Sequence, residues 1–233
     1  MASRYRTGIT ADRIVGEAVE LTARKGLYEW SIRDLVAEIG TSHSVVYEKV
    51  GGRDQLCGAV AQRVFEGVPI PVPDAGVDWR DALLAWLIPL CRHLYDYPGV
   101  AKWLTLHGGP TAFPTPHDGV GRFVECIADA GFSEPGRVFG ACVVTAMSAV
   151  MVADERGPRQ REAVRDHATM MDSIEQRAQH EPALAALMPY LDDFANRNDE
   201  RRATEAQLAL TMNALLDGFE WQRRRAARQD RER

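Results

Sequence analysis

Polar side chains that can hydrogen-bond to bases or phosphates gather between residues 41 and 53. The candidate contacts to a nucleic acid are Arg33, Thr41, Ser42, His43, Ser44, Tyr47, Lys49 and Arg53. Hydroxyl, imidazole and ammonium groups donate or accept at base edges, and the cations neutralise phosphate charge. Val45, Val46 and Val50 are interspersed with them, so a short helix could bury the valines. The pattern predicts a helix that presents its polar side to a nucleic acid.

A second short helix, directly before the first, must hold it in place. Its apolar residues follow the i, i+3, i+4, i+7 spacing of an amphipathic helix: Ile32, Leu35, Val36 and Ile39. Ser31 is a suitable N-cap and Asp34 is close to the capping-box pattern. Gly40 can end this helix in a left-handed conformation, and Ser42 can cap the next one. Two short helices joined by a glycine turn form a helix-turn-helix.

The flanking segments complete a small helical domain. Thr10 can cap an opening helix that reaches Lys25, and residues 54–67 form a helix after the polar one. The stretch Gly51-Gly52-Arg53-Asp54 is a helix start whose amides and cation could hold a phosphate. Arg4 and Arg6 form either a solvated tail or a basic arm that contacts the minor groove or phosphates.

These residues resemble the TetR (tetracycline-repressor-like) family of bacterial transcription regulators over about residues 10–65. The resemblance lies in a helix ending at Gly26, the S-I-R-D-L-V-A-E-I-G segment, Tyr47 and a G-x-[KR]-x-x-L tail at Gly51 to Leu56. The sequence departs from the family pattern at Trp30, Lys49 and Val50. The resemblance implies a DNA-binding domain at residues 1–67, followed by a domain for ligand binding and dimerisation at residues 68–233.

Helical patterns fill the rest of the chain, and no segment shows sustained period-two alternation. Alternating prolines at residues 68–77 forbid a helix and mark the domain boundary. Beyond it we expect helices at 78–96, kinked near Pro89, at 100–107, 118–130, 135–155, after Gly157-Pro158, at 181–194 and at 203–225. The predicted fold class is therefore all-α: a three-helix head with a larger helical domain.

Residues 135–155 and 203–222 are too apolar for the surface of a monomer, so we expect a partner to cover them. The resemblance implies a four-helix interface between two subunits. A homodimer would hold two polar helices about 34–36 Å apart, which suits a palindromic operator on double-stranded DNA.

Large adaptable side chains are concentrated in the middle of the chain. The candidate ligand-binding residues are Trp86, Trp103, His107, Phe113, Phe123, Phe139, Met147, Met151 and Met170. Any one of them taken alone is more typical of an ordinary helical core than of a ligand site. Taken as a set, with the family resemblance, they favour a cavity for a largely apolar small-molecule effector.

Composition narrows the possible functions. The net charge of −5 and pI near 5.7 exclude a protein that coats nucleic acid, and residues 1–67 carry nine cationic and nine anionic side chains. The separated cysteines, at positions 57, 91, 126 and 142, are typical of reduced thiols in a cytoplasmic protein. The apolar run at 138–153 is short of the roughly 20 residues that cross a bilayer, so no membrane partner is expected. No cofactor and no metal site are expected.

Two other functions remain open at this point. An enzyme is disfavoured because the sequence contains no H-E-x-x-H, G-x-S-x-G or glycine-rich nucleotide loop. A helical protein-interaction module with a repurposed helix-turn-helix is favoured only by the neutral charge of residues 1–67. The leading prediction is a ligand-responsive transcriptional regulator that acts as a repressor.

Overall fold

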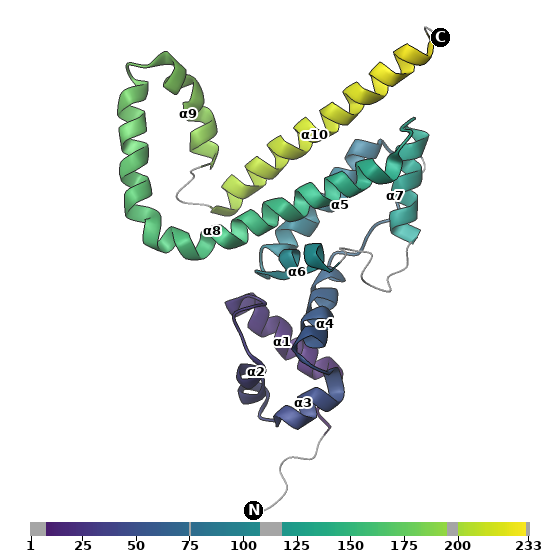
Figure 1. The fold of residues 1–233 in the computed structure, drawn as a ribbon, viewed down its shortest axis with the longest axis vertical. Coiled ribbons are helices and arrows are strands. Elements are labelled where there is room, and N and C mark those ends of the chain that lie inside the picture. Colours follow the sequence, from purple (N-terminus) through teal and green to yellow (C-terminus); the bar gives the residue numbers. More distant parts are fainter. Residues whose placement is uncertain (1–7, 75, 108–117, 195–199, 232–233) are drawn as a thin grey trace, which may run out of the picture. The chain divides into compact units, whose positions relative to one another are not determined.

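The computed structural model describes residues 8–74, 76–107, 118–194 and 200–231. Only the backbone is described for residues 118, 155–170, 190, 192–194, 200–205 and 230–231. Within these ranges every regular element is an α-helix (Figure 1). The predicted all-helical fold class is confirmed.

Packing divides the chain into two compact units. The first unit comprises residues 1–72 and 89–121, and the second comprises residues 73–88 and 122–233. The divisions fall within two helices, α5 (Trp79–Leu94) at Pro89 and α7 (Asp118–Asp129) at Arg122. The predicted domains, a DNA-binding domain at 1–67 and a ligand-binding and dimerisation domain at 68–233, stay a prediction.

The first unit is built on α1 (Ala11–Lys25), which contacts α2 (Ile32–Ile39), α3 (His43–Val50) and α4 (Arg53–Phe65). The side chains at its centre are fully buried: Ile14, Ala18, Leu21, Leu27, Leu35, Val46, Leu56 and Val60. Thr10 caps α1 by accepting the Arg13 N–H at 3.2 Å, and Gly26 follows its last residue. The predicted three-helix head is therefore present as helices, with α4 as the fourth.

A short helix from later in the chain, α6 (Val100–Leu106), also belongs to this unit and packs against α4. The Trp103 indole lies so close to the α4 backbone that a Cβ added at Gly58 would stand 3.2 Å from it. A glycine in the middle of α4 lowers helix propensity, and here it allows this close approach.

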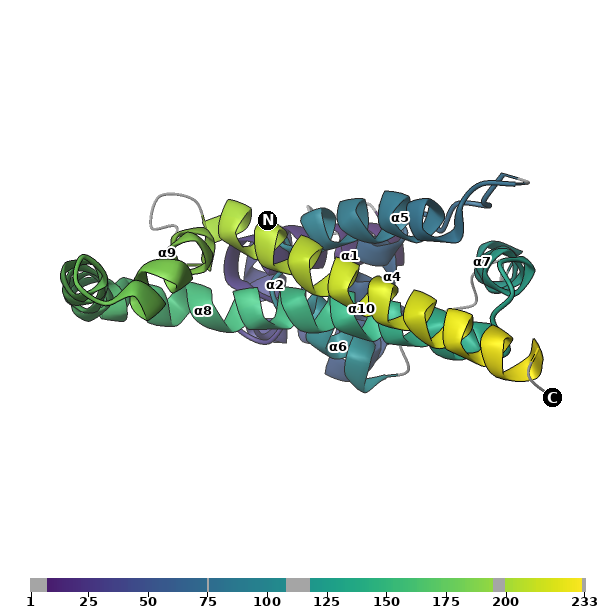
Figure 2. The same cartoon turned by 90° about the horizontal axis from the view of Figure 1, so that it is seen from above.

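The second unit contains α8 (Pro135–Ala178), α9 (Pro182–Phe194) and α10 (Glu200–Arg231). Helices α8 and α10 run beside each other in both views, and α9 contacts both (Figure 1, Figure 2). Arg80 of α5 forms a 2.6 Å ion pair with Asp217 of α10. Arg223 of α10 donates to the Ala130 carbonyl at 3.1 Å, so α10 is tied to two other parts of the unit.

The predicted end of the 135–155 helix at Gly157-Pro158 is wrong. The helix continues through this dipeptide to Ala178, so two predicted helices are one of 44 residues. A proline inside a helix removes one hydrogen bond and clashes with the preceding turn, which bends a helix without necessarily ending it. Figure 1 shows α8 as one bent ribbon. Similarly, α10 extends from Glu200 to Arg231, beyond the predicted range of 203–225. Residues 108–117, between the predicted helices at 100–107 and 118–130, lie outside the described residues.

The first half of α8, Pro135–Asp154, is long and apolar enough to cross a membrane by length and composition. The core helix of a folded domain has the same composition, and one side of this segment is buried within the unit: Val138, Cys142, Ala146 and Val150. The other side is exposed, with 57% of Val144 and 48% of Val152 accessible. The helix is therefore a core helix with a second apolar side still uncovered.

Candidate nucleic-acid interface

The helix α2 begins with a complete capping box. The Ser31 Oγ accepts the Asp34 N–H at 3.2 Å, and an Asp34 oxygen accepts the Ser31 N–H at 2.7 Å. Hydrogen bonds from Ser31 lower the pKa of the Asp34 carboxyl. Two backbone donors that the helix leaves unpaired are thereby satisfied, which fixes where α2 starts.

The turn between α2 and α3 takes the geometry that the sequence predicted. Gly40 has φ 68° and ψ 43°, a left-handed conformation that side chains disfavour. Its N–H and that of Thr41 both donate to the Val36 carbonyl, at 3.0 and 3.2 Å. Ser42 then caps α3 by accepting the Val45 N–H at 3.4 Å. The two helices therefore start and stop at defined residues, as a helix-turn-helix requires.

Helix α3 has one buried anchor and a polar exposed side. Val46 is fully buried, whereas 54% of Tyr47 is exposed. The other predicted contact residues around it are also exposed: Arg33, Ser42, His43, Ser44 and Lys49, with Thr41 half-buried. An exposed tyrosine beside hydroxyl and imidazole groups provides donors, acceptors and a flat ring for a groove.

The Lys49 ammonium on this surface has only a weak ion-pair partner within the protein. The Lys49 ammonium lies 3.0 Å from Glu48, and both side chains are exposed. Exposed ion pairs of this kind contribute at most about 1 kcal/mol. Lys49 can therefore exchange Glu48 for a phosphate at little cost.

Arg53, which we expected to hold a phosphate, has partners inside the protein. One guanidinium nitrogen, Nη2, donates to the carbonyls of Leu27 and Trp30, at 2.5 and 2.8 Å. The guanidinium lies over the Trp30 ring, 3.6 Å from its centroid. Its other terminal nitrogen, Nη1, is buried. The side chain thus fastens the start of α4 to the loop between α1 and α2.

Trp30, where the sequence departs from the family pattern, is a structural residue. Its indole N–H donates to the Thr22 hydroxyl at 2.9 Å, and that hydroxyl donates to the Ala18 carbonyl at 2.8 Å. Trp30 is 3% exposed and Thr22 is fully buried. A tryptophan fits here because its polar atom is paired and its ring supports Arg53.

Gln55 and Thr22 take part in this site although neither was predicted from the sequence. The Gln55 side chain accepts the Gly52 N–H at 2.9 Å, which occupies one amide that we had expected to bind phosphate. A glutamine three residues after a potential N-cap is a capping-box signal, so this contact could have been predicted. Nothing in the sequence indicated the bond between Thr22 and Trp30, because it depends on how α1 faces the following loop.

The predicted ligand-binding residues fall into different units. Trp86, Phe123, Phe139 and Met147 are buried in the second unit, where Met151 is half-buried. The Trp86 ring stacks on Phe123 and on Phe139, with centroids 5.5 and 6.0 Å away. Helices α5, α7 and α8 therefore meet at three aromatic rings.

Trp103 and His107 lie in the first unit instead. Their rings stack with centroids 4.2 Å apart, and the His107 Nδ1 is 2.8 Å from the Trp103 carbonyl. Phe113 lies outside the described residues, and the side chain of Met170 is not described. The structure thus brings together the part of the predicted set that lies in the second unit, and Trp103 and His107 belong to the first unit.

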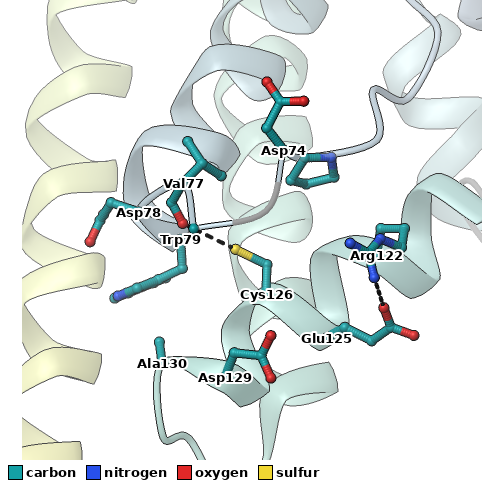
Figure 3. Close-up of a pocket in the computed structure, with 11 residues that line it drawn as sticks. Asp74, Val77, Asp78, Trp79, Arg122, Glu125, Cys126, Asp129 and Ala130 are labelled. Carbon is teal, nitrogen blue, oxygen red and sulfur yellow. Dashed lines mark hydrogen bonds and ion pairs between the residues drawn. The ribbon is translucent and has the colours of Figure 1, made fainter.

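A polar hollow of about 360 Å³ lies on the second unit, between residues 73–79 and α7. It is lined by Asp74, Trp79, Glu125 and Asp129, with Cys126 directed toward the Val77 carbonyl at 3.6 Å (Figure 3). Burial, and then Asp129 and Asp78, raise the pKa of the Cys126 thiol. None of the predicted ligand-binding residues lines this hollow.

The described residues define a class of protein: a capped helix-turn-helix whose second helix exposes polar side chains, within a set of elements that are all helices. Curated relatives are of the same kind. An HTH-type transcriptional regulator from Saccharopolyspora erythraea is 28% identical over 190 residues, which are 80% of this chain and 78% of the relative. The HTH-type transcriptional repressor DrrR1 from Streptomyces coeruleorubidus is 28% identical over 129 residues, 54% of this chain and 46% of that protein. No known family model matches the chain.

Solved structures place the fold within the TetR group. The TetR family protein ActR from Streptomyces coelicolor, in complex with actinorhodin, superimposes with a TM-score of 0.63 at 23% identity, over 91% of this chain and 98% of ActR. TetR from Acinetobacter baumannii gives a TM-score of 0.65 at 15% identity, over 93% of this chain and 99% of that one. The chain has the TetR fold, as its sequence predicted, and its relatives are helix-turn-helix transcriptional regulators.

Proposed function

We propose that this protein is a ligand-responsive transcriptional repressor. It binds palindromic operator DNA as a homodimer, and a small molecule bound within residues 68–233 releases it. The observation that carries the proposal is the exposed polar side of α3, which Val46 anchors from beneath and which begins and ends at capped residues. Such a helix is shaped to enter the major groove.

The proposed DNA contacts divide by chemistry. His43, Ser44 and Tyr47 read base edges, because their polar atoms lie on the exposed side of α3. Lys49 and Arg33 neutralise phosphates, and Thr41 and Ser42 approach the backbone at the start of α3. Arg53 acts beneath this surface, as the fastener between α4 and the α1–α2 loop.

The homodimer is supported by apolar side chains that one subunit leaves exposed on α8 and α10. Val144 and Val152 on α8, and Leu210 and Trp221 on α10, are 48–60% exposed. Residues 210 and 221 are eleven apart, close to three helical turns, so they share one side of α10. A second copy that covers both helices would bury this surface.

The effector is proposed to bind beside Trp86, Phe123, Phe139, Met147 and Met151. Solved relatives support a small-molecule effector, because ActR was determined with actinorhodin and a TetR variant from Acinetobacter baumannii with minocycline. No cofactor or metal enters this proposal, and a cytoplasmic location is part of it.

Coupling to the DNA contacts would run through α6. Its Trp103 packs on the middle of α4 at Gly58, and the Leu27 N–H donates to the Pro98 carbonyl at 2.7 Å just before α6. Because Arg53 binds the Leu27 carbonyl, the start of α4 is linked to the same segment. A displacement of α6 would therefore reach α4 at two points, and an effector that favours the displaced state would lower DNA affinity.

The test is a mobility-shift titration with fragments of the source genome at several salt concentrations. Tyr47→Ala is expected to lower affinity roughly 10- to 100-fold, as expected for one lost base contact in each half-site. Lys49→Gln is expected to reduce the slope of log affinity against log salt by about two per dimer. The control is Arg177→Gln, because the Arg177 side chain is exposed near the end of α8. It should change neither the affinity nor the salt slope. Unchanged binding by both α3 variants would exclude this surface and favour a protein-interaction module.

A further inference from the structure

Among the side chains that the structure describes in the second unit, the indole N–H of Trp86 is buried and makes no hydrogen bond. Trp86 is 1% exposed, so bulk solvent does not reach the group. Leaving a buried donor unpaired costs about 1–3 kcal/mol, and folded proteins rarely tolerate it. A donor kept in this state is a candidate for pairing with a bound molecule.

The neighbouring rings do not accept this hydrogen. Trp86 is within 3° of parallel to Phe139 and within 29° of parallel to Phe123, so both pairs are stacked. An N–H lies in the plane of its ring, and it reaches a ring face only in an edge-to-face arrangement. The donor therefore lies in the plane of the Trp86 ring and does not point at the face of either phenylalanine.

The surroundings define which acceptor fits. The buried side chains that these three helices contribute to the second unit are apolar, among them Leu83, Leu87, Ile127 and Val143. Burial raises the pKa of the Cys142 thiol, three residues from Phe139, to about 12, which indicates how poorly this region supports charge. An uncharged oxygen, such as a ring ketone or phenol, can pair with the indole here, whereas a carboxylate would be buried without a counter-charge.

We propose that the Trp86 indole N–H is the donor that recognises the effector, and that the effector is a flat polycyclic aromatic molecule bearing an uncharged ring oxygen. The proposal rests on the proposed function, since it names the ligand class of the same effector site. A flat molecule that accepts this hydrogen in the plane of the indole would lie within 3° of parallel to Phe139 and within 29° of parallel to Phe123. Met147 is the adaptable side chain on the same buried side of α8.

A matched pair of probes isolates the hydrogen bond. Fluorenone and fluorene share a flat three-ring outline and differ by one carbonyl oxygen. Wild-type dimer is expected to bind fluorenone roughly tenfold more tightly than fluorene, the effect of one net hydrogen bond. Trp86→Phe keeps an aromatic ring and removes the donor, so it should bind the two probes with equal affinity by calorimetry.

A second measurement does not depend on the variant folding. In wild-type protein with ¹⁵N-labelled tryptophan, the Trp86 indole proton should shift downfield with fluorenone and not with fluorene. The Trp30 indole is the internal control, because it already donates to Thr22 and should not move. A preference for fluorenone that survives Trp86→Phe, a wild type without that preference, or a Trp86 signal that ignores fluorenone would each overturn the proposal.

Failure here is distinguishable from failure of the proposed function. DNA binding by the unliganded dimer is measured separately in the mobility-shift titration. If DNA binds and fluorenone does not, the ligand class is wrong and the regulator stands. If fluorenone binds through Trp86 and no DNA binds, the site stands and the regulator is wrong.

Discussion

Two buried tryptophans, Trp30 in the first unit and Trp86 in the second, differ in what happens to the indole N–H. Trp30 donates to Thr22 at 2.9 Å and supports the Arg53 guanidinium on its ring. Trp86 is at least as deeply buried, yet its N–H has no partner in the described protein. The hydrogen-bonding capacity of the Trp30 indole is therefore satisfied within the chain, and that of the Trp86 indole is not.

The same difference extends to the units around them. In the first unit the helix-turn-helix caps are filled by Ser31, Ser42 and Gln55, so α3 is held by bonds internal to the chain. The second unit leaves Val144 and Trp221 exposed on α8 and α10. The first unit can present α3 without a change in its internal hydrogen bonds. The second unit has exposed apolar side chains and an unpaired indole N–H, so it can respond to a subunit that covers the former or a ligand that pairs with the latter.

The largest expected effect comes from disrupting the proposed subunit contact through the exposed apolar sides of α8 and α10. The double variant Leu210→Glu and Trp221→Glu places two charges on one side of α10 and should convert the dimer to monomer in sedimentation velocity. Operator affinity should then fall by more than 100-fold, because the two half-sites are no longer read together.

Leu187→Glu on α9 is the matched control, since Leu187 is also about half exposed and lies on neither α8 nor α10. It should remain a dimer. If the α10 double variant also remains a dimer, the exposed side of α10 is not the subunit contact.

The two tryptophans should respond differently to loss of the N–H. Trp30→Phe breaks a buried hydrogen bond and should lower the free energy of unfolding by about 1–2 kcal/mol. Trp86→Phe loses some packing but also removes an unpaired donor, so its net change should lie within about 1 kcal/mol of zero. Chemical denaturation of both variants measures the difference, and equal losses would mean that the Trp86 N–H is satisfied in the folded protein.

The smallest expected effect concerns Glu220, which is internally paired within the second unit. Arg223 and Arg224 donate to its carboxylate at 2.6–2.9 Å, and these bonds lower the Glu220 pKa to about 2. Because the folded pKa is below the ordinary value of 4.5, the stabilisation is complete above pH 4.5 and is lost as the pH falls toward 2.

Glu220→Gln should therefore cost up to about 1 kcal/mol of unfolding free energy at neutral pH, and this difference from wild type should shrink below pH 4.5. Denaturation curves recorded from pH 7 to pH 3 measure it. A difference that stays constant across this range would mean that the ion pairs of Glu220 do not stabilise the folded state.

Local signals predicted the first unit well. Thr10, Ser31, Gly40 and Ser42 begin or end helices at the residues that their chemistry indicated, because capping is decided within a few residues of the chain. The same local logic failed at Gly157-Pro158, where α8 continues as one helix. A breaker residue indicates a local cost, and the rest of a long helix can outweigh it.

The candidate site was predictable only in part. Tyr47 and its neighbours could be predicted as an exposed polar side, since α3 needs a single buried anchor at Val46. The inward direction of Arg53 was not predictable, because it depends on two carbonyls 23 and 26 residues earlier in the chain. Contacts between distant segments have no signature in the spacing of one segment.

Selection from a random-sequence DNA pool by the purified wild-type protein tests the central claim most directly. We predict an enriched palindrome whose half-sites are about one helical turn apart or a multiple of it. We also predict that Tyr47→Ala enriches that sequence much less. No enrichment by the wild type, or an enriched single half-site bound by a monomer, would contradict the proposal that a homodimer binds DNA through its two α3 helices.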